Sequence, residues 1–86
     1  MRQTVEVQIP EDQINHAATS FIKKASEYAS YILITRGGNS VNAKSRLGLL
    51  SMRLEYGTSV DIAAEGVDAA EALAALEQVL NPADHD

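Results

Sequence analysis

The chain has 86 residues, 45% of them hydrophobic, and no cysteine. This length fits one small domain with one modest core. The lack of cysteine excludes a disulfide framework and a thiolate metal site, and the two histidines, His16 and His85, lie far apart in the sequence. We therefore expect no cofactor and no metal site, and we expect one domain over residues 1–86 with a disordered tail at residues 82–86.

The charge is unevenly distributed along the chain. The formal net charge is -5, yet seven Lys and Arg and only four acidic residues precede Leu54, whereas residues 54–86 hold eight acidic residues and no Lys or Arg. The negative total argues against direct binding of nucleic acid. No apolar run is long enough for a signal peptide or a membrane span. We expect a cytoplasmic protein, away from the membrane, whose basic first two thirds bind an acidic patch on another protein.

The first quarter of the chain predicts a strand followed by a helix. Residues 4–9 alternate between polar and apolar side chains, which is typical of a half-buried strand, and Pro10 closes it. A helix is then predicted over residues 15–28, with Asp12 or Asn15 as its N-cap. Its apolar stripe consists of Ala18, Phe21, Ile22, Ala25 and Tyr28.

The middle of the chain predicts a hairpin and a short helix. Strands are expected at residues 31–36 and 39–43, joined by a turn at Gly37-Gly38, because glycine adopts positive φ without steric cost. Residues 44–52 predict a short helix that Ser45 caps. Leu47, Leu50 and also Leu49 are candidates for its apolar side.

The last third predicts one more strand and one more helix. Val60, Ile62 and Ala64 alternate with polar or small residues, and after Gly66 the pair Asp68 and Glu71 is typical of a capping box. Asn81-Pro82 ends this helix. The element order is β-α-β-β-α-β-α, which predicts an α+β fold: an open-faced two-layer sandwich with three helices on one face of a four-stranded antiparallel sheet.

Three stretches, together with this order, resemble the HPr family, the small phosphocarrier proteins of the bacterial phosphoenolpyruvate-sugar phosphotransferase system. "SVNAKSRLGLLSM" (residues 40–52) is similar to the regulatory-serine segment of Gram-positive members. "ASEYASYILI" resembles the end of the family's first helix and its second strand, and "EGVDAAEALAALEQVL" resembles its last turn and helix. The resemblance covers essentially the whole chain.

The chain departs from the family at the phosphocarrier motif, Gly-Leu/Ile-His-x-Arg-Pro-Ala. Depending on a one-residue gap, the histidine of that motif falls on Ile14 or on Asn15, so that His16 lies one or two positions late. A phosphohistidine needs a neighbouring cation, but residues 11–21 contain no Lys or Arg, and Glu11 and Asp12 would repel a phosphate.

The resemblance therefore implies a Crh-like regulatory protein and not an enzyme. It implies phosphorylation of Ser45 by the family's serine kinase, and a catabolite-control transcription factor as a further partner, bound by a monomer or weak dimer. The expected binding residues are Lys44, Arg46, Leu47, Leu50 and Met52; Leu47 is the leading candidate, whereas Leu50 is more consistent with the core. Two alternatives stay open: an active phosphocarrier that uses His16, and an HPr-like domain with a partner outside sugar transport.

Overall fold

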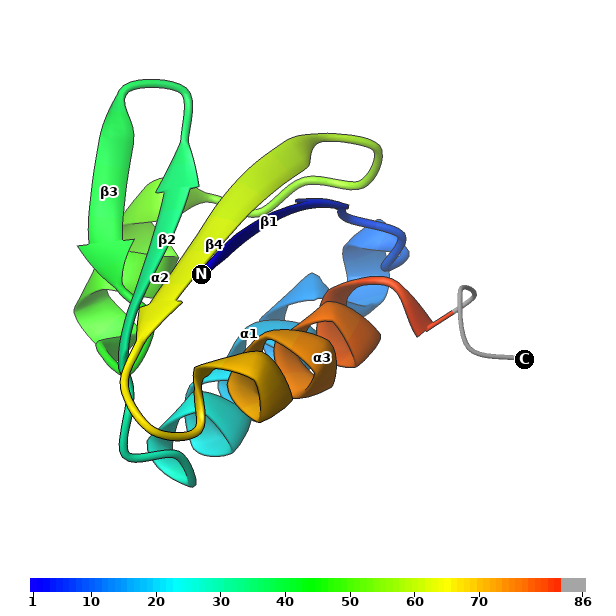
Figure 1. Cartoon of the computed structure of the whole chain (residues 1–86). Helices are drawn as coiled ribbons and strands as arrows, with labels where there is room; N and C mark the ends of the chain where they lie inside the picture. Colours follow the sequence, from blue (N-terminus) through cyan, green and yellow to red (C-terminus); the bar gives the residue numbers. More distant parts are fainter. Residues whose placement is uncertain (83–86) are drawn as a thin grey trace.

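The computed structural model describes residues 1–82, and its elements follow the predicted order (Figure 1). Of the expected tail, only Pro82 falls within the described residues, and residues 83–86 lie outside them. No helix in the described part has the length and apolar character that a bilayer span requires. The elements are β1 (Arg2–Glu6), the 3-10 turn η1 (Glu11–Gln13), α1 (Ile14–Ser26), β2 (Tyr31–Arg36), β3 (Asn39–Asn42), α2 (Arg46–Met52), β4 (Ser59–Glu65) and α3 (Ala69–Leu80).

The four strands form one antiparallel sheet in the order β1-β4-β2-β3. The central strand β4 pairs with β1 through Val5 and Val60, and with β2 through Ile34 and Ile62. The first strand therefore lies beside the last one, and the helices cover one face of the sheet (Figure 1). This arrangement confirms the predicted open-faced α+β sandwich.

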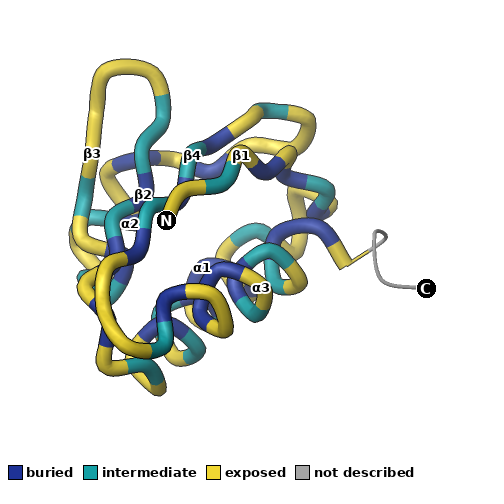
Figure 2. The backbone as a smooth tube through the Cα atoms, in the orientation of Figure 1, coloured by how far each residue is buried: buried dark blue, intermediate teal, exposed yellow. Residues whose placement is uncertain are grey.

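The core lies between the sheet and the helices, where the buried segments of both layers face each other (Figure 2). Alternate strand residues point inward because successive side chains of a strand point to opposite faces. Burying this apolar surface is the main favourable contribution to folding. The fully or almost fully buried large side chains are Val7, Phe21, Ile32, Ile34, Leu49, Val60, Ile62, Leu76 and Leu80.

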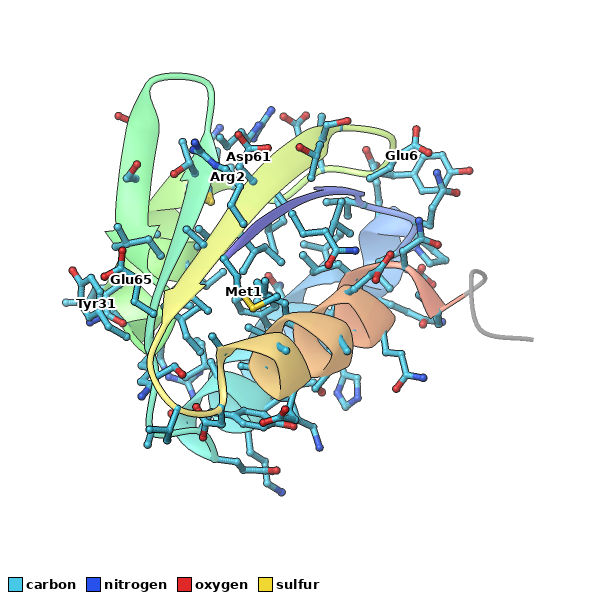
Figure 3. The ribbon with its side chains drawn as sticks, viewed as in Figure 1. Met1, Arg2, Glu6, Tyr31, Asp61 and Glu65 are labelled. Atoms are coloured by element: carbon cyan, nitrogen blue, oxygen red, sulfur yellow. The ribbon has the colours of Figure 1, made fainter. Side chains whose placement is uncertain are left out.

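The other face of the sheet carries polar and charged side chains (Figure 3). Arg2 and Asp61 lie on adjacent strands with their charged groups 3.7 Å apart, and the Thr4 hydroxyl donates a hydrogen bond of 2.6 Å to Asp61. Tyr31 and Glu65 lie opposite each other in the register of β2 and β4. This face carries exposed and half-buried residues and no covering layer within residues 1–82.

The predicted strand at residues 4–9 is shifted in the structure, where β1 runs from Arg2 to Glu6. Beyond Glu6 the regular ladder ends: Val7 N–H still donates to Thr58 O, just before β4, at 2.7 Å, but Gln8 N–H donates to Leu80 O at the end of α3 at 2.8 Å. Val7 and Ile9 remain buried. The alternation of polar and apolar residues therefore predicts the buried side chains correctly but the extent of the strand incorrectly.

Two of the three predicted helix caps are wrong. Neither Asp12 nor Asn15 caps α1; the residue before it is Gln13, which makes no side-chain cap bond, and the chain enters the helix through η1. Asp68 also makes no cap bond at α3. Its carboxylate instead accepts the backbone N–H groups of Ala29, at 2.8 Å, and Ser30, at 3.0 Å, so the proposed capping box with Glu71 does not form.

Candidate protein-binding site at helix α2

Ser45 lies at the N-terminus of α2, as its sequence position predicts. Its Oγ accepts a hydrogen bond of 3.1 Å from Gly48 N–H, and its backbone is extended, with φ -99° and ψ 118°. This geometry satisfies one of the free N–H groups of the first turn. The N-cap prediction for Ser45 is confirmed, and the partly exposed residue faces solvent at the start of the helix.

Two basic residues flank Ser45 and differ in their surroundings. Lys44 Nζ donates a hydrogen bond of 2.8 Å to the carbonyl of Tyr28, which ties it to the loop after α1. Arg46 is exposed and forms no ion pair within residues 1–82. Two basic residues therefore adjoin Ser45 in the sequence, although the whole chain is acidic.

The apolar residues of α2 divide between two sides of the helix. Leu49 and Met52 are 1% and 6% exposed and belong to the core, whereas Leu47 and Leu50 are 80% and 55% exposed. Each pair is three residues apart and so shares one side of the helix. The position predicted for Leu50 in the core is wrong, and Met52, predicted as a binding residue, is buried and cannot offer its side chain to a partner.

Gly48 explains which side of α2 faces inward. A Cβ at this position would lie 3.0 Å from Cβ of Val41 on β3, closer than side chains normally approach. A larger residue at position 48 would require Val41 or the helix to shift by a few tenths of an ångström, so the close approach of α2 to the hairpin favours glycine here. Leu49 and Met52 then point into the core, and Leu47 and Leu50 point outward.

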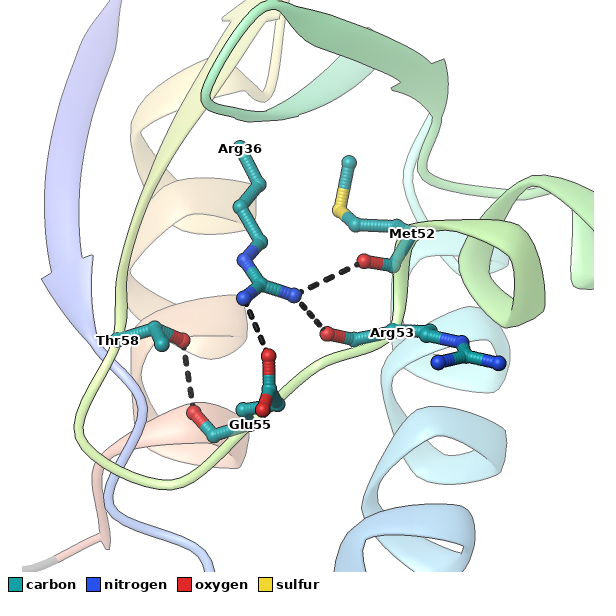
Figure 4. Close-up of polar contacts among 5 residues, drawn as sticks. All are labelled: Arg36, Met52, Arg53, Glu55 and Thr58. Carbon is teal, nitrogen blue, oxygen red and sulfur yellow. Dashed lines mark hydrogen bonds and ion pairs between the residues drawn. The ribbon is translucent and has the colours of Figure 1, made fainter.

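The other end of α2 is fixed by Arg36, the last residue of β2 (Figure 4). Its Nη1 donates to the carbonyls of Met52, at 3.1 Å, and of Arg53, and its Nη2 lies 2.5 Å from Glu55 Oε1. The Thr58 hydroxyl donates to the carbonyl of Glu55 at 2.7 Å. A cation here complements the negative end of the helix dipole, so Arg36 holds the last turn of α2 and the following loop together.

A cavity of about 330 Å³ lies between the N-terminal half of α1 and the C-terminal end of α2. Its apolar walls come from both helices and the loop after α2, and three polar residues also border it. Arg53, one of the three, has φ 57°, the left-handed region that side chains other than glycine rarely adopt. The lining residues are Ile14, Asn15, Ala18, Leu49, Leu50, Arg53, Leu54 and Glu55.

His16 does not border this cavity. It is exposed in the first turn of α1, two positions after Ile14 and two before Ala18, both of which face the cavity. Two residues correspond to a rotation of roughly 200° about a helix axis, which places His16 on the far side of α1. The structure therefore brings Ser45, Arg46, Leu47 and Leu50 together on α2 but leaves His16 apart from them.

Sequence reasoning missed two residues of this region, Arg36 and Arg53. The position of Arg36 before Gly37-Gly38 marks it as a strand end, but nothing local shows that its side chain reaches a helix end 16 residues later. The left-handed backbone of Arg53 has no sequence signal, because this conformation normally predicts glycine. Within residues 1–82 no group of three or more His, Cys, Asp and Glu side chains is placed to hold a metal ion.

The comparisons with known proteins agree with this geometry. The family model described as "PTS HPr component phosphorylation site" matches residues 1–82. Over 73 residues the chain is 36% identical to the HPr-like protein Crh of Bacillus subtilis, covering 85% of this chain and 86% of that protein. This chain belongs to the HPr family. Its similarity to Crh proteins supports the Crh-like type within that family.

Solved structures of the family share the fold. HPr-C-His from Thermoanaerobacter tengcongensis superposes with a TM-score of 0.89 at 31% identity, covering 94% of this chain and 91% of that one. The phosphocarrier protein HPr from Bacillus anthracis gives 0.88 at 32% identity, covering 93% and 95%. The four-stranded sheet with its helices on one face is therefore the HPr fold.

Proposed function

We propose that this protein is a regulatory protein-binding module, and not an enzyme, that is controlled by phosphorylation of Ser45. The observation that carries the proposal is the arrangement on α2: a partly exposed serine at the N-cap, an exposed arginine beside it, and two exposed leucines on the next turns. Exposed apolar residues of this kind are typical of interaction surfaces. The similarity to Crh supports a regulatory role of the same type.

Phosphorylation would change the charge of this surface strongly. A phosphoserine carries about -1.5 to -2 charges at neutral pH. Lys44 and Arg46 flank the hydroxyl and would partly neutralise it, while the first-turn N–H groups of α2 remain available to its oxygens. The modification therefore turns a basic patch into a mixed one, and different proteins would bind the two forms.

The partners that the family suggests are a serine kinase, which modifies Ser45, and a catabolite-control transcription factor, which binds the modified form. Lys44, Arg46, Leu47 and Leu50 would contact them. Met52 is left out of this surface because it is buried. Such a role fits a protein of the cytoplasm.

The surroundings of His16 support the view that this chain has no working phosphocarrier histidine. The family position falls on Ile14 or Asn15, neither of which is a phosphoryl acceptor of this kind. His16 itself lies on the other side of α1 from the cavity and from α2, and η1 places Glu11 and Asp12 just before the helix. These carboxylates would disfavour a phosphate there.

The test is intact-mass analysis after incubation with each of the two phosphorylating systems. With the serine kinase and ATP, we expect one phosphate, which is lost in Ser45→Ala and kept in the matched control Ser51→Ala on the same helix. With phosphoenolpyruvate and the first enzyme of the phosphotransferase system, we expect none. An unmodified Ser45 under conditions that label a conventional Gram-positive HPr would refute the proposal. So would an acid-labile phosphate that disappears in His16→Gln.

A further inference from the structure

We infer that the open face of the sheet holds a second protein-binding site, in which Tyr31 and Glu65 bind an arginine side chain of the partner. Leu33 and Ala63 beside them offer an apolar surface to the residue next to that arginine. This site lies on the side of the sheet away from the helices. It is therefore separate from α2 and independent of the phosphorylation proposed for Ser45, and a partner bound there would leave α2 accessible.

The register of the sheet brings Tyr31 and Glu65 together. Tyr31 is the first residue of β2, Glu65 is the last residue of β4, and the two lie directly opposite each other. Opposite residues of antiparallel strands have Cβ atoms about 4.5–5.5 Å apart. Their chain neighbours Ile32 and Ala64 are fully buried, so Tyr31 and Glu65 point to the outer face, where Figure 3 shows them side by side.

An apolar patch adjoins this pair. Leu33 follows Tyr31 by two residues on β2, and Ala63 precedes Glu65 by two residues on β4, so all four residues share the outer face. Leu33 and Ala63 are opposite each other in the register and are half-buried, whereas Tyr31 is 59% exposed. The ring of Tyr31 and the two smaller side chains thus form one continuous surface.

The next row of side chains on this face is already hydrogen-bonded. The hydroxyl groups of Thr35 and Ser40 lie 2.7 Å apart, and the Thr4 hydroxyl donates to Asp61 at 2.6 Å. These polar groups therefore have partners within the sheet, and the apolar patch ends at this row.

The unpaired charge of the patch is negative. Within residues 1–82 the Glu65 carboxylate forms no hydrogen bond and no ion pair, although it is exposed. Two cationic groups are near it in the sheet, but each has a partner: Arg2 lies 3.7 Å from Asp61, and the Met1 ammonium group donates to the carbonyl of Ala64 at 2.8 Å. A cation of another protein is therefore attracted to Glu65, and an anion is repelled.

Arginine fits this pair better than lysine does. A guanidinium group is flat, so that it can donate two parallel N–H groups to a carboxylate and stack on an aromatic ring, whereas an ammonium group is a point charge. Cations within about 6 Å of a tyrosine ring are attracted to its face. Glu65 and Tyr31 supply both partners from adjacent strands.

The test is titration of the 15N-labelled, unmodified protein with the synthetic peptide acetyl-Gly-Arg-Leu-Gly-amide, followed by amide chemical shifts. We expect saturable shifts at Tyr31, Leu33 and Glu65. Binding should be at least about threefold weaker when lysine replaces the arginine, about threefold weaker when serine replaces the leucine, and lost when glutamate replaces the arginine. Absence of saturable shifts with the first peptide, or equal binding of the lysine or the glutamate peptide, would overturn the inference.

Variants with matched controls locate the contact. Tyr31→Ser and Glu65→Gln should each weaken peptide binding about fivefold. The control for the first is Tyr56→Ser, because Tyr56 is 57% exposed but precedes β4, so that roughly 20 Å of strand separate it from Glu65. The control for the second is Glu71→Gln, on the exposed side of α3. If either control weakens binding as much as its counterpart, the site is not at Tyr31 and Glu65.

Two further measurements separate the possible failures. Labelling by the serine kinase is measured on the same preparation: labelled protein that does not bind the peptide refutes the sheet-face site alone, and unlabelled protein that binds it refutes only the regulatory proposal. Sedimentation is run on the protein and on Tyr31→Ser, because Arg46 and Leu47 of a second copy are an exposed arginine and leucine in sequence. Self-association that Tyr31→Ser abolishes would show that a second copy occupies the face, which contradicts a separate partner.

Discussion

Ser30 and Asp68, 38 residues apart in the chain, are joined by a hydrogen bond of 2.5 Å from the serine hydroxyl to the carboxylate. The same carboxylate accepts the N–H groups of Ala29 and Ser30. It thereby ties the turn before α3 to the loop between α1 and β2. Asp68 acts as a tertiary link at a place where the sequence alone indicates a helix cap.

This link predicts how stability depends on pH. The hydrogen bond from the Ser30 hydroxyl, and next the one from Ala29 N–H, hold the pKa of Asp68 below its ordinary value of 3.8. Because the pKa of Asp68 is lower in the folded than in the unfolded state, the link contributes fully to the free energy of unfolding above the ordinary pKa. This contribution is lost as the pH falls through the pKa of the folded protein. We expect the free energy of unfolding, measured by urea titration, to fall with decreasing pH in this range.

Two variants test whether the Asp68 carboxylate causes this pH dependence of stability. Asp68→Asn should be less stable at pH 7 and should show a flatter dependence on pH below about pH 5. Ser30→Ala, which removes only the hydroxyl donor, should lie between this variant and the natural protein. Equal slopes in all three proteins would show that Asp68 does not contribute to acid unfolding.

Gly66 makes the same link sterically possible. It has φ 148°, and a Cβ there would lie 2.6 Å from Ser30 Oγ and 2.7 Å from Ser30 Cα. Gly66→Ala should therefore lower the free energy of unfolding by about 2 kcal/mol or more, from strain and overlap. In Gly38→Ala, by contrast, the new Cβ meets nothing within 4 Å, and a change within about 0.5 kcal/mol is expected. Similar losses in both variants would contradict this reading of the turn.

Arg36 should contribute to stability through the end of α2. Arg36→Met keeps the apolar stem but leaves the carbonyls of Met52 and Arg53 without their donor and removes the pair with Glu55. Because the pair is partly solvated, we expect a loss of about 1 to 2 kcal/mol in chemical denaturation. The control is Arg2→Met, since Arg2 is 68% exposed and lies 3.7 Å from Asp61, where at most about 0.5 kcal/mol is expected.

The sequence predicts the fold well because its main signals are local. Alternation in the strands, three- and four-residue spacing in the helices, and glycine at the hairpin together determine the element order and the buried faces. The errors arise where a partner comes from a distant part of the chain. Asp68 has the residue type and spacing of a cap, but the loop at Ala29 and Ser30 takes its carboxylate. The end of β1 likewise depends on Thr58 and Leu80.

The site is less predictable, since the side that a short helix buries depends on the elements that it packs against. Three leucines and a methionine within α2 allow more than one buried side, and the contact of Gly48 with Val41 selects among them. For the same reason the cavity could not be derived, because α1 and α2 border it from segments about thirty residues apart. The N-cap at Ser45 was predictable because its hydrogen bond is local.

Substitutions on the two sides of α2 should differ sharply in their cost. Leu49→Ala removes a buried side chain and should lower the free energy of unfolding by about 2 to 4 kcal/mol. Leu47→Ala removes an exposed one and should change it by about 0.5 kcal/mol or less. Thermal or chemical unfolding of the two variants measures this difference in the free energy of unfolding. A larger cost for Leu47→Ala would mean that α2 is rotated relative to the sheet.

Ser45 should have a structural role that can be separated from its regulatory one. Ser45→Ala removes the hydrogen bond to Gly48 N–H and should cost about 1 kcal/mol, whereas Ser45→Asp keeps an acceptor at the N-cap and should change the stability by less than about 0.5 kcal/mol. Only Ser45→Asp adds negative charge beside Lys44 and Arg46. It should therefore imitate part of the effect of phosphorylation and strengthen binding of the transcription factor proposed as the partner of the phosphorylated form, while Ser45→Ala should not. Equal effects of the two variants on this binding would show that Ser45 acts through the stability of the helix and not through charge.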